Sequence, residues 1–186
     1  MSLIQNQPVI LAIDPGTREL GFAVLEGENL IYYGVKTVTN RKAPNLVLET
    51  VNSFIKSLIE KYQPSILAIE KMFIAQKNSA LLFVVAEQIK AIARENKILI
   101  WEQAPLAIRK RLCQKGRATK REAAKIVADR YPELLRYYNR TRFWELEYYA
   151  NLFDAVAVGL VCFEDYKISD STNGQIVQSM KGGNDE

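Results

Sequence analysis

Three carboxylates that lie far apart in the sequence each stand in an apolar stretch of chain. Asp14 and Glu70 end the runs VILAID and SILAIE, and Asp154 interrupts the longer run YANLFDAVAVGLVCF. A carboxylate is costly to bury in such surroundings unless a cation or hydrogen-bond donors compensate its charge. Two buried carboxylates that lie close together also repel each other, and a hard divalent ion with oxygen ligands would neutralise them.

Each carboxylate has an ordinary structural alternative. Asp14 precedes Pro-Gly and would suit a turn, whereas Glu70 would pair with Lys71 at the end of a strand. Asp154 would lie on an exposed stripe of a helix. As a set, in the order strand, strand and final helix, the three fit a two-metal site that cuts phosphodiesters. There one ion activates water and the other stabilises the leaving oxygen, with the ions about 3.5–4 Å apart.

Composition narrows the chemistry further. The chain contains no histidine, which excludes Ser-His and Cys-His nucleophile pairs and His-ligated zinc. Cys113 and Cys162 have no partner at metal-ligand spacing, so we expect a reduced, cytoplasmic protein. We find no apolar run that looks long enough to span a bilayer and expect no membrane partner.

The elements that would position the carboxylates follow from apolar periodicity. Strands are predicted at 9–14, 20–27, 30–38, 65–70 and 97–101, and helices at 44–62, 78–96, 104–113, 120–131 and 149–163. The first three strands form an antiparallel meander, and the order β-β-β-α-β-α-β-α predicts an α/β fold with a mixed five-stranded sheet flanked by helices. One domain would cover 1–166, and the polar tail 167–186 is predicted to be disordered.

This fold would bring the first two carboxylates together. Ligands of open α/β sheets collect at the carboxyl ends of the strands. If the strands ending at Asp14 and Glu70 lie side by side, both side chains face one cleft.

A basic segment follows the fifth predicted strand. Its lysines and arginines are Arg109, Lys110, Arg111, Lys115, Arg117, Lys120, Arg121, Lys125, Arg130, Arg136, Arg140 and Arg142. Within the segment they are opposed by Glu122, Asp129 and Glu133 alone. Such a segment is typical of a protein with a polyanionic partner, and a solvated helix surface is the alternative.

Three motifs resemble those of the RuvC family of Holliday-junction resolvases. ILAIDPGTRELGFAVLE resembles the first motif, LAIEKMFIAQKNSALLFVVAEQIKAI the second, and NLFDAVAVGL the closing helix. The similarity covers residues 9 to 163. It implies a ribonuclease-H-like fold, a homodimer, and Mg²⁺-dependent cleavage of four-way DNA junctions, with two ions per site and Mn²⁺ as a substitute.

The resemblance also implies residue roles. Asp14, Glu70 and Asp154 would be the catalytic metal carboxylates, with Asp14 bridging both ions. Phe73 matches an aromatic residue that the family places against bases, and core packing is its alternative. The basic residues matched to DNA contacts, or adjoining them, are Arg109, Lys110, Lys115, Arg117, Lys120 and Arg121.

Two features depart from the family pattern. Asn151 stands where the family has a fourth carboxylate; it shares a helix face with Asp154, and its amide oxygen is a weaker metal ligand. Glu147 would lie on that face and substitute for the missing charge if the helix extends back to Trp144. The segment 133–151 is unusually aromatic and basic, which suits either stacking on bases or packing onto the domain or across a dimer.

The leading hypothesis is therefore a metal-dependent, structure-selective endonuclease acting on four-way junctions. One alternative is a non-catalytic relative that binds junctions, which Asn151 favours. A second is a ribonuclease-H-like nuclease acting on another nucleic acid, such as an RNA–DNA hybrid. A third is an actin-like ATPase, because IDPGT resembles a phosphate-binding hairpin, but the chain has room for one such domain. Whether a branch-migration helicase is a partner is not indicated by the sequence.

Overall fold

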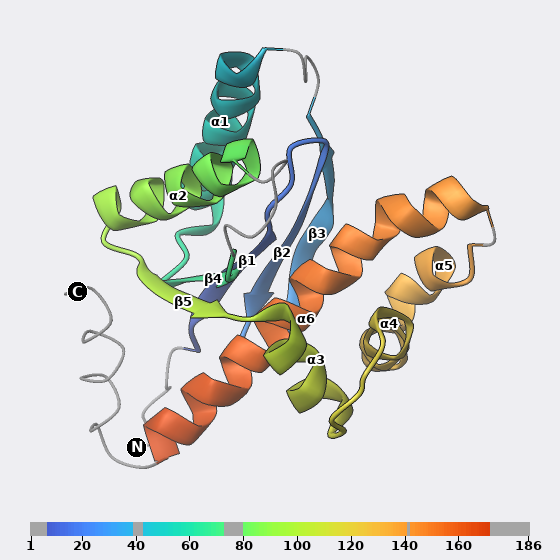
Figure 1. The fold of residues 1–186 in the computed structure, drawn as a ribbon. Coiled ribbons are helices and arrows are strands. Elements are labelled where there is room, and N and C mark those ends of the chain that lie inside the picture. Colours follow the sequence, from blue (N-terminus) through green and yellow to red (C-terminus); the bar gives the residue numbers. More distant parts are fainter. Residues whose placement is uncertain (1–6, 39–42, 73–79, 141, 172–186) are drawn as a thin grey trace.

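Alternating and continuous apolar runs build one mixed sheet with helices on both faces (Figure 1). The computed structural model describes residues 7–38, 43–72, 80–140 and 142–171. The strands are β1 (Val9–Asp14), β2 (Glu19–Glu26), β3 (Asn29–Thr37), β4 (Ile66–Glu70) and β5 (Leu99–Gln103). They lie in the order β3-β2-β1-β4-β5; β2 is antiparallel to both β1 and β3, whereas β1, β4 and β5 are parallel. The predicted mixed five-stranded sheet is confirmed.

The helices form two layers. They are α1 (Pro44–Tyr62), α2 (Ala80–Glu95), α3 (Pro105–Cys113), α4 (Lys120–Arg130), the 3₁₀ turn η1 (Pro132–Leu134), α5 (Leu135–Tyr138) and α6 (Phe143–Ser171). One apolar core joins the sheet to α1 and α2, and a second core joins it to α3, α4 and α6. Figure 1 shows α6 running across the sheet on the face opposite α1.

Strand alternation decides which side chain enters which core. In β1, Leu11 and Ile13 pack toward α1 and α2, whereas Ile10 and Ala12 pack toward α6. Because successive side chains of a strand point to opposite faces, Asp14 projects to the α6 side. The same alternation applies to β4, so both carboxylate-bearing strand ends aim at one helix.

Two glycines let α6 lie close to the sheet. A Cβ atom on Gly21 of β2 would stand 1.9 Å from the backbone oxygen of Asn151 in α6. A Cβ atom on Gly159 of α6 would stand 2.4 Å from the Leu25 side chain. Any larger residue at either position would push the helix away from the strands.

Helix α6 is longer than predicted at both ends. It begins at Phe143 instead of residue 149, and it continues five residues past the domain boundary predicted at 166. The remainder of the predicted tail, 172–186, lies outside the described residues, and the single-domain organisation stays a prediction. By length and composition α6 could cross a membrane, contrary to the sequence-based expectation; 67% of its apolar window is buried inside the fold, as in a core helix.

Strand β5 lies two residues later than predicted. Lys97 adopts a left-handed conformation (φ 58°), and Ile98 donates its N–H to the Ala93 carbonyl. These residues close α2, so the strand begins only at Leu99.

The tyrosines of the aromatic segment pack onto the domain. Tyr137 contacts Tyr33 and Tyr149, and Tyr138 meets Phe153 edge-on. By contrast, the side chains of Phe143 and Trp144 are 74% and 60% exposed.

Candidate active site

The two strand-end carboxylates lie next to each other at the carboxyl edge of the sheet. Strands β1 and β4 pair in parallel through Ile13 and Ile69, and Asp14 and Glu70 are the next residues on each strand. Because side chains alternate along each strand, both carboxylates lie on the face of the sheet that packs against α6. The predicted adjacency of the two strands is confirmed.

Helix α6 brings the third carboxylate to the same place. Asn151 rests on Gly21, which is the pairing partner of Asp14 in β2. Asp154 follows within one turn and is 7% exposed. The alternative that Asp154 lies on an exposed stripe is therefore wrong. A glycine inside an apolar strand is a sequence signal for such a close approach, and our sequence analysis did not use it.

Burial and mutual repulsion perturb this cluster. Burial raises the pKa of Asp14 well above its usual range, and the negative charges of Glu70 and Asp154 raise it further. Burial followed by the charge of Asp154 raises the pKa of Glu70 to about 7. The three carboxylates thus lie within electrostatic range of one another, and the site favours a cation or a proton.

A lysine side chain supplies positive charge to this cluster. The Lys120 ammonium lies 2.5 Å from a carboxylate oxygen of Asp154. Burial lowers the pKa of Lys120, but the charge and hydrogen bond of Asp154, together with the charges of Asp14 and Glu70, outweigh it and raise the pKa. Lys120 is the first residue of α4, and a reciprocal capping box between Thr119 and Glu122 stabilises the start of this helix.

The donor set is all oxygen, which suits a hard divalent ion. Within the described ranges, no three His, Cys, Asp or Glu side chains stand close enough to form a single-ion site as they are. The ion pair between Lys120 and Asp154 explains this spacing, because it holds one of the three carboxylates against an ammonium group. The residues therefore fit a metal chemically, once Asp154 exchanges its lysine partner for an ion.

Arg109 adds a second cation to the site. Its positive charge acts on Glu70, and its Nε is buried without a hydrogen-bond partner in the described part of the chain. A buried guanidinium nitrogen with no acceptor is costly, and an incoming phosphate oxygen would satisfy it.

Much of the remaining basic segment is neutralised by ion pairs, some of them with acids far away in the sequence. Arg111 pairs with Asp165 at 2.5 Å, and Arg130 pairs with Glu28 at 3.1 Å. Lys115 forms an ion pair with Glu122. Among the described residues, the basic side chains of this segment with no ion pair are Arg109, Lys110, Arg117, Arg121, Arg136 and Arg142. The free positive charge is thus concentrated along α3, the following loop and the start of α4.

Three other predicted site residues have different outcomes. Phe73 lies outside the described residues. Asn151 is half-buried, and its backbone packs on Gly21. This backbone contact positions α6 at the site, independently of whether the Asn151 side chain binds a metal. Glu147 lies four residues before Asn151 in α6, as required, but it is exposed and does not contribute to the pKa shifts of Asp14 or Glu70.

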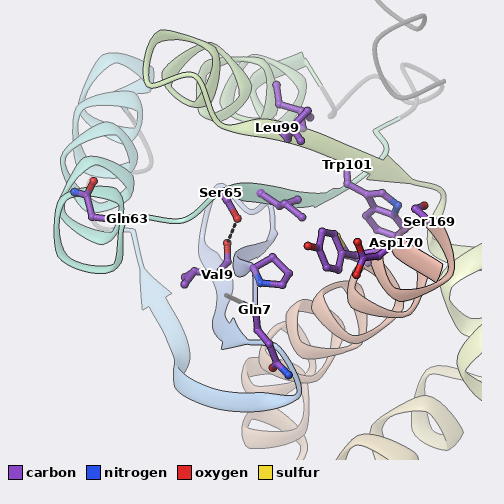
Figure 2. A pocket seen from close by; sticks show the side chains of 13 residues that line it. Gln7, Val9, Gln63, Ser65, Leu99, Trp101, Ser169 and Asp170 are labelled. Atoms are coloured by element: carbon purple, nitrogen blue, oxygen red, sulfur yellow. Dashed lines mark hydrogen bonds between the residues drawn. The ribbon is translucent and has the colours of Figure 1, made fainter. Parts of the chain in front are cut away.

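An apolar pocket of about 490 Å³ lies elsewhere (Figure 2). It is lined by residues at the start of β1, β4 and β5, including Val9 and Leu99, and by the end of α6, including Asp170. The Ser65 hydroxyl donates to the Val9 carbonyl at 3.3 Å. The dashed line in Figure 2 marks this hydrogen bond. Since Asp14 and Glu70 stand at the opposite ends of their strands, this pocket is separate from the carboxylate site.

Comparison with known proteins identifies the family of the chain. The family model described as crossover junction endodeoxyribonuclease RuvC matches residues 10–138. The chain belongs to the RuvC family. The resemblance inferred from the sequence motifs is thereby confirmed.

Individual RuvC proteins are similar to more than half of this chain. The crossover junction endodeoxyribonuclease RuvC of Caldicellulosiruptor saccharolyticus is 29% identical over 126 residues, which cover 63% of this chain and 75% of that protein. The protein of the same name from Caldanaerobacter subterraneus is 31% identical over 125 residues, with the same coverage. The structure of Thermus thermophilus RuvC in complex with Holliday junction substrate superposes with a TM-score of 0.68 at 19% identity, covering 87% of this chain and 96% of that one. That likeness supports the ribonuclease-H-like fold.

The family match ends before α6. Asp154 and most of the aromatic segment therefore lie beyond residue 138, where the family model gives no residue-level correspondence. The placement of Asp154 beside Asp14 and Glu70 is a result of the structure.

Proposed function

We propose that this RuvC-family chain is a metal-dependent, structure-selective endonuclease that cleaves phosphodiester bonds in four-way DNA junctions. The observation that carries the proposal is the convergence of Asp14, Glu70 and Asp154 at one sheet edge, beside unpaired basic groups. The relatives named above are crossover junction endodeoxyribonucleases, and one similar structure holds a Holliday junction. We also propose a homodimer, because two symmetry-related sites would place paired nicks on two strands of like polarity and so resolve the junction. We propose a cytoplasmic location for it.

Asp14, Glu70 and Asp154 would hold two Mg²⁺ ions, with Mn²⁺ as a substitute and Asn151 as a weaker ligand. When bound, such ions activate water and stabilise the leaving oxygen. Asp14 and Glu70 hold protons more tightly than ordinary carboxylates, so both must release them before they can ligate. Metal affinity is therefore expected to rise with pH.

The cations of the site have separate roles. With metal held by Asp154, Lys120 would exchange that carboxylate for the phosphate under attack. Arg109 offers its unsatisfied Nε to a neighbouring phosphate oxygen. Lys110, Lys115, Arg117 and Arg121 extend this positive surface along the DNA backbone, with Lys115 exchanging Glu122 for phosphate.

A non-catalytic junction binder is the competing function. Asn151 in place of a carboxylate favours it. The basic surface would then be the whole functional site, and its affinity would fall steeply with salt.

Cleavage of three substrates side by side distinguishes these functions. A labelled four-way junction, a duplex of the same sequence and an RNA–DNA hybrid are incubated with and without Mg²⁺. We expect Mg²⁺-dependent nicks in the junction, with 5′-phosphate ends. Asp14→Asn should abolish cleavage and retain junction binding, whereas Asp129→Asn, which removes an exposed carboxylate of α4, should cleave normally.

Two results would contradict the proposal. Junction binding by the wild-type protein without any nicking would support the non-catalytic function. Preferential cleavage of the RNA–DNA hybrid would indicate a ribonuclease of the same fold.

A further inference from the structure

A second pocket adjoins the carboxylate site on the α6 side of the sheet. Its volume is about 210 Å³, and it lies between α4, α5 and α6. Lys120 and Asp154 form part of its wall, so any group bound there is adjacent to the catalytic carboxylates. The pocket is smaller than the roughly 300–1,000 Å³ typical of sites for drug-sized ligands, so a single ring system is a better match.

Four aromatic rings, together with Ala124, Leu146 and Ala150, form the apolar wall of the pocket. Tyr137 and Tyr149 lie with ring centroids 4.6 Å apart, and Tyr138 meets Phe153 edge-on at 6.1 Å. These contacts fix the rings before any ligand arrives, which reduces the entropy lost on binding. The hydroxyls of Tyr138 and Tyr149 take part in no hydrogen bond with the described residues, so they are available to polar atoms of a ligand.

The charge of the pocket indicates an anionic ligand. Arg121 lines the pocket and has no ion pair within the described ranges, whereas the neighbouring Lys120 is paired with Asp154. Aromatic walls with a cationic rim are the combination that binds nucleotides, since rings stack on bases while cations pair with phosphates.

We propose that this pocket, here called the tyrosine pocket (Tyr137, Tyr138, Tyr149 and Phe153), holds one unpaired nucleobase next to the phosphate that is cut. The inference rests on the proposed function, because it takes a DNA junction as the ligand. Bases at the centre of a junction are the least costly to unstack, and enzymes that engage a displaced base hold it in such a pocket. The pocket would then set how the strand is positioned at the site; its α6 wall, with Tyr149 and Phe153, lies beyond the family match at residues 10–138.

A double-mutant cycle tests the proposal without requiring cleavage. Leu146 lines the pocket and its side chain is 40% exposed, so Leu146→Trp fills the pocket with little risk to folding. Ile31→Trp, on β3 with 48% exposure, is the matched control. Binding is measured in EDTA by fluorescence anisotropy, with intact junctions and with junctions abasic at each of the four nucleotides nearest the crossover in turn.

We expect one abasic position to weaken binding by the wild-type protein about tenfold, as loss of one stacked base would. The Ile31→Trp protein should show the same loss. With Leu146→Trp the abasic junction should bind no more weakly than the intact one, because the base is already excluded.

The proposal is overturned if the abasic penalty is absent from the wild-type protein or persists in Leu146→Trp. A change of oligomeric state in Leu146→Trp with an unchanged abasic penalty would instead make this face a contact between copies of the chain. Failure of the proposed function has a different signature. If the wild-type protein binds the junction but never cuts it, the double-mutant cycle can still be measured and only the proposed function fails. If the protein does not bind the junction at all, the proposed function and the base-binding pocket are both refuted.

Discussion

Neutralising Glu70 should stabilise the metal-free protein at the same time as it abolishes cleavage. Burial and the charge of Asp154 raise the pKa of Glu70 from 4.5 to about 7. Since one pKa unit corresponds to about 1.36 kcal/mol, ionising Glu70 in the folded state costs about 3 kcal/mol. Glu70→Gln removes that cost and should raise the melting temperature by about 10 °C above pH 7.

The pH dependence of this gain follows from linkage. Because the folded pKa is the higher one, the folded state holds the proton between pH 4.5 and about 7 while the unfolded state has lost it. Wild-type stability therefore declines as the pH rises through that window, and the Glu70→Gln variant lacks this decline. The difference between the two proteins should be near zero at pH 4.5 and complete above pH 7.

Differential scanning calorimetry in EDTA at several pH values measures this difference. Glu60→Gln, an exposed substitution of the same kind on α1, should leave the melting temperature unchanged. If Glu70→Gln is destabilising above pH 7, or if its effect does not vary with pH, the carboxylates are not crowded as described.

Three further predictions concern the elements that hold the site. Gly21→Ala should destabilise the protein by about 1–3 kcal/mol in chemical denaturation and reduce cleavage, because the added Cβ displaces α6. Gly116→Ala is the control: a Cβ at this position meets open space, so stability and cleavage should both be unchanged. Thr119→Ala should cost about 1 kcal/mol in the same assay by removing the cap of α4, and an unchanged midpoint would contradict the capping box. Lys120→Met should destabilise the metal-free protein by about 1–2 kcal/mol, which is less than for a fully buried ion pair because Lys120 is largely exposed. In a thermal-shift assay, Mg²⁺ should stabilise this variant more than it stabilises the wild type. Equal stabilisation of both proteins would mean that Lys120 does not compensate the charge of Asp154.

The sequence predicts the sheet and its carboxylate edge well because both depend on local patterns. Apolar runs ending on Asp14 and Glu70 define two parallel strands, and the strand order then makes them neighbours. Helix α1 matches its predicted range because Pro44 begins it and apolar residues recur at helical spacing.

What the sequence could not predict depends on contacts between distant residues. The sequence overstates the free positive charge of the basic segment, because Glu28 and Asp165 pair with its arginines only in the folded chain. The ends of α6 were missed because they are aromatic or polar and break the apolar pattern of its centre. The ion pair of Lys120 with Asp154 joins two helices and has no local signature.

Binding of Mn²⁺, followed by electron paramagnetic resonance, tests most directly whether the three carboxylates form a metal site. The wild-type protein should bind Mn²⁺, and both Asp14→Asn and Asp154→Asn should weaken binding at least about tenfold, as loss of a metal ligand does. Asp129→Asn should bind as the wild type does. Unchanged Mn²⁺ affinity in Asp14→Asn would contradict the account.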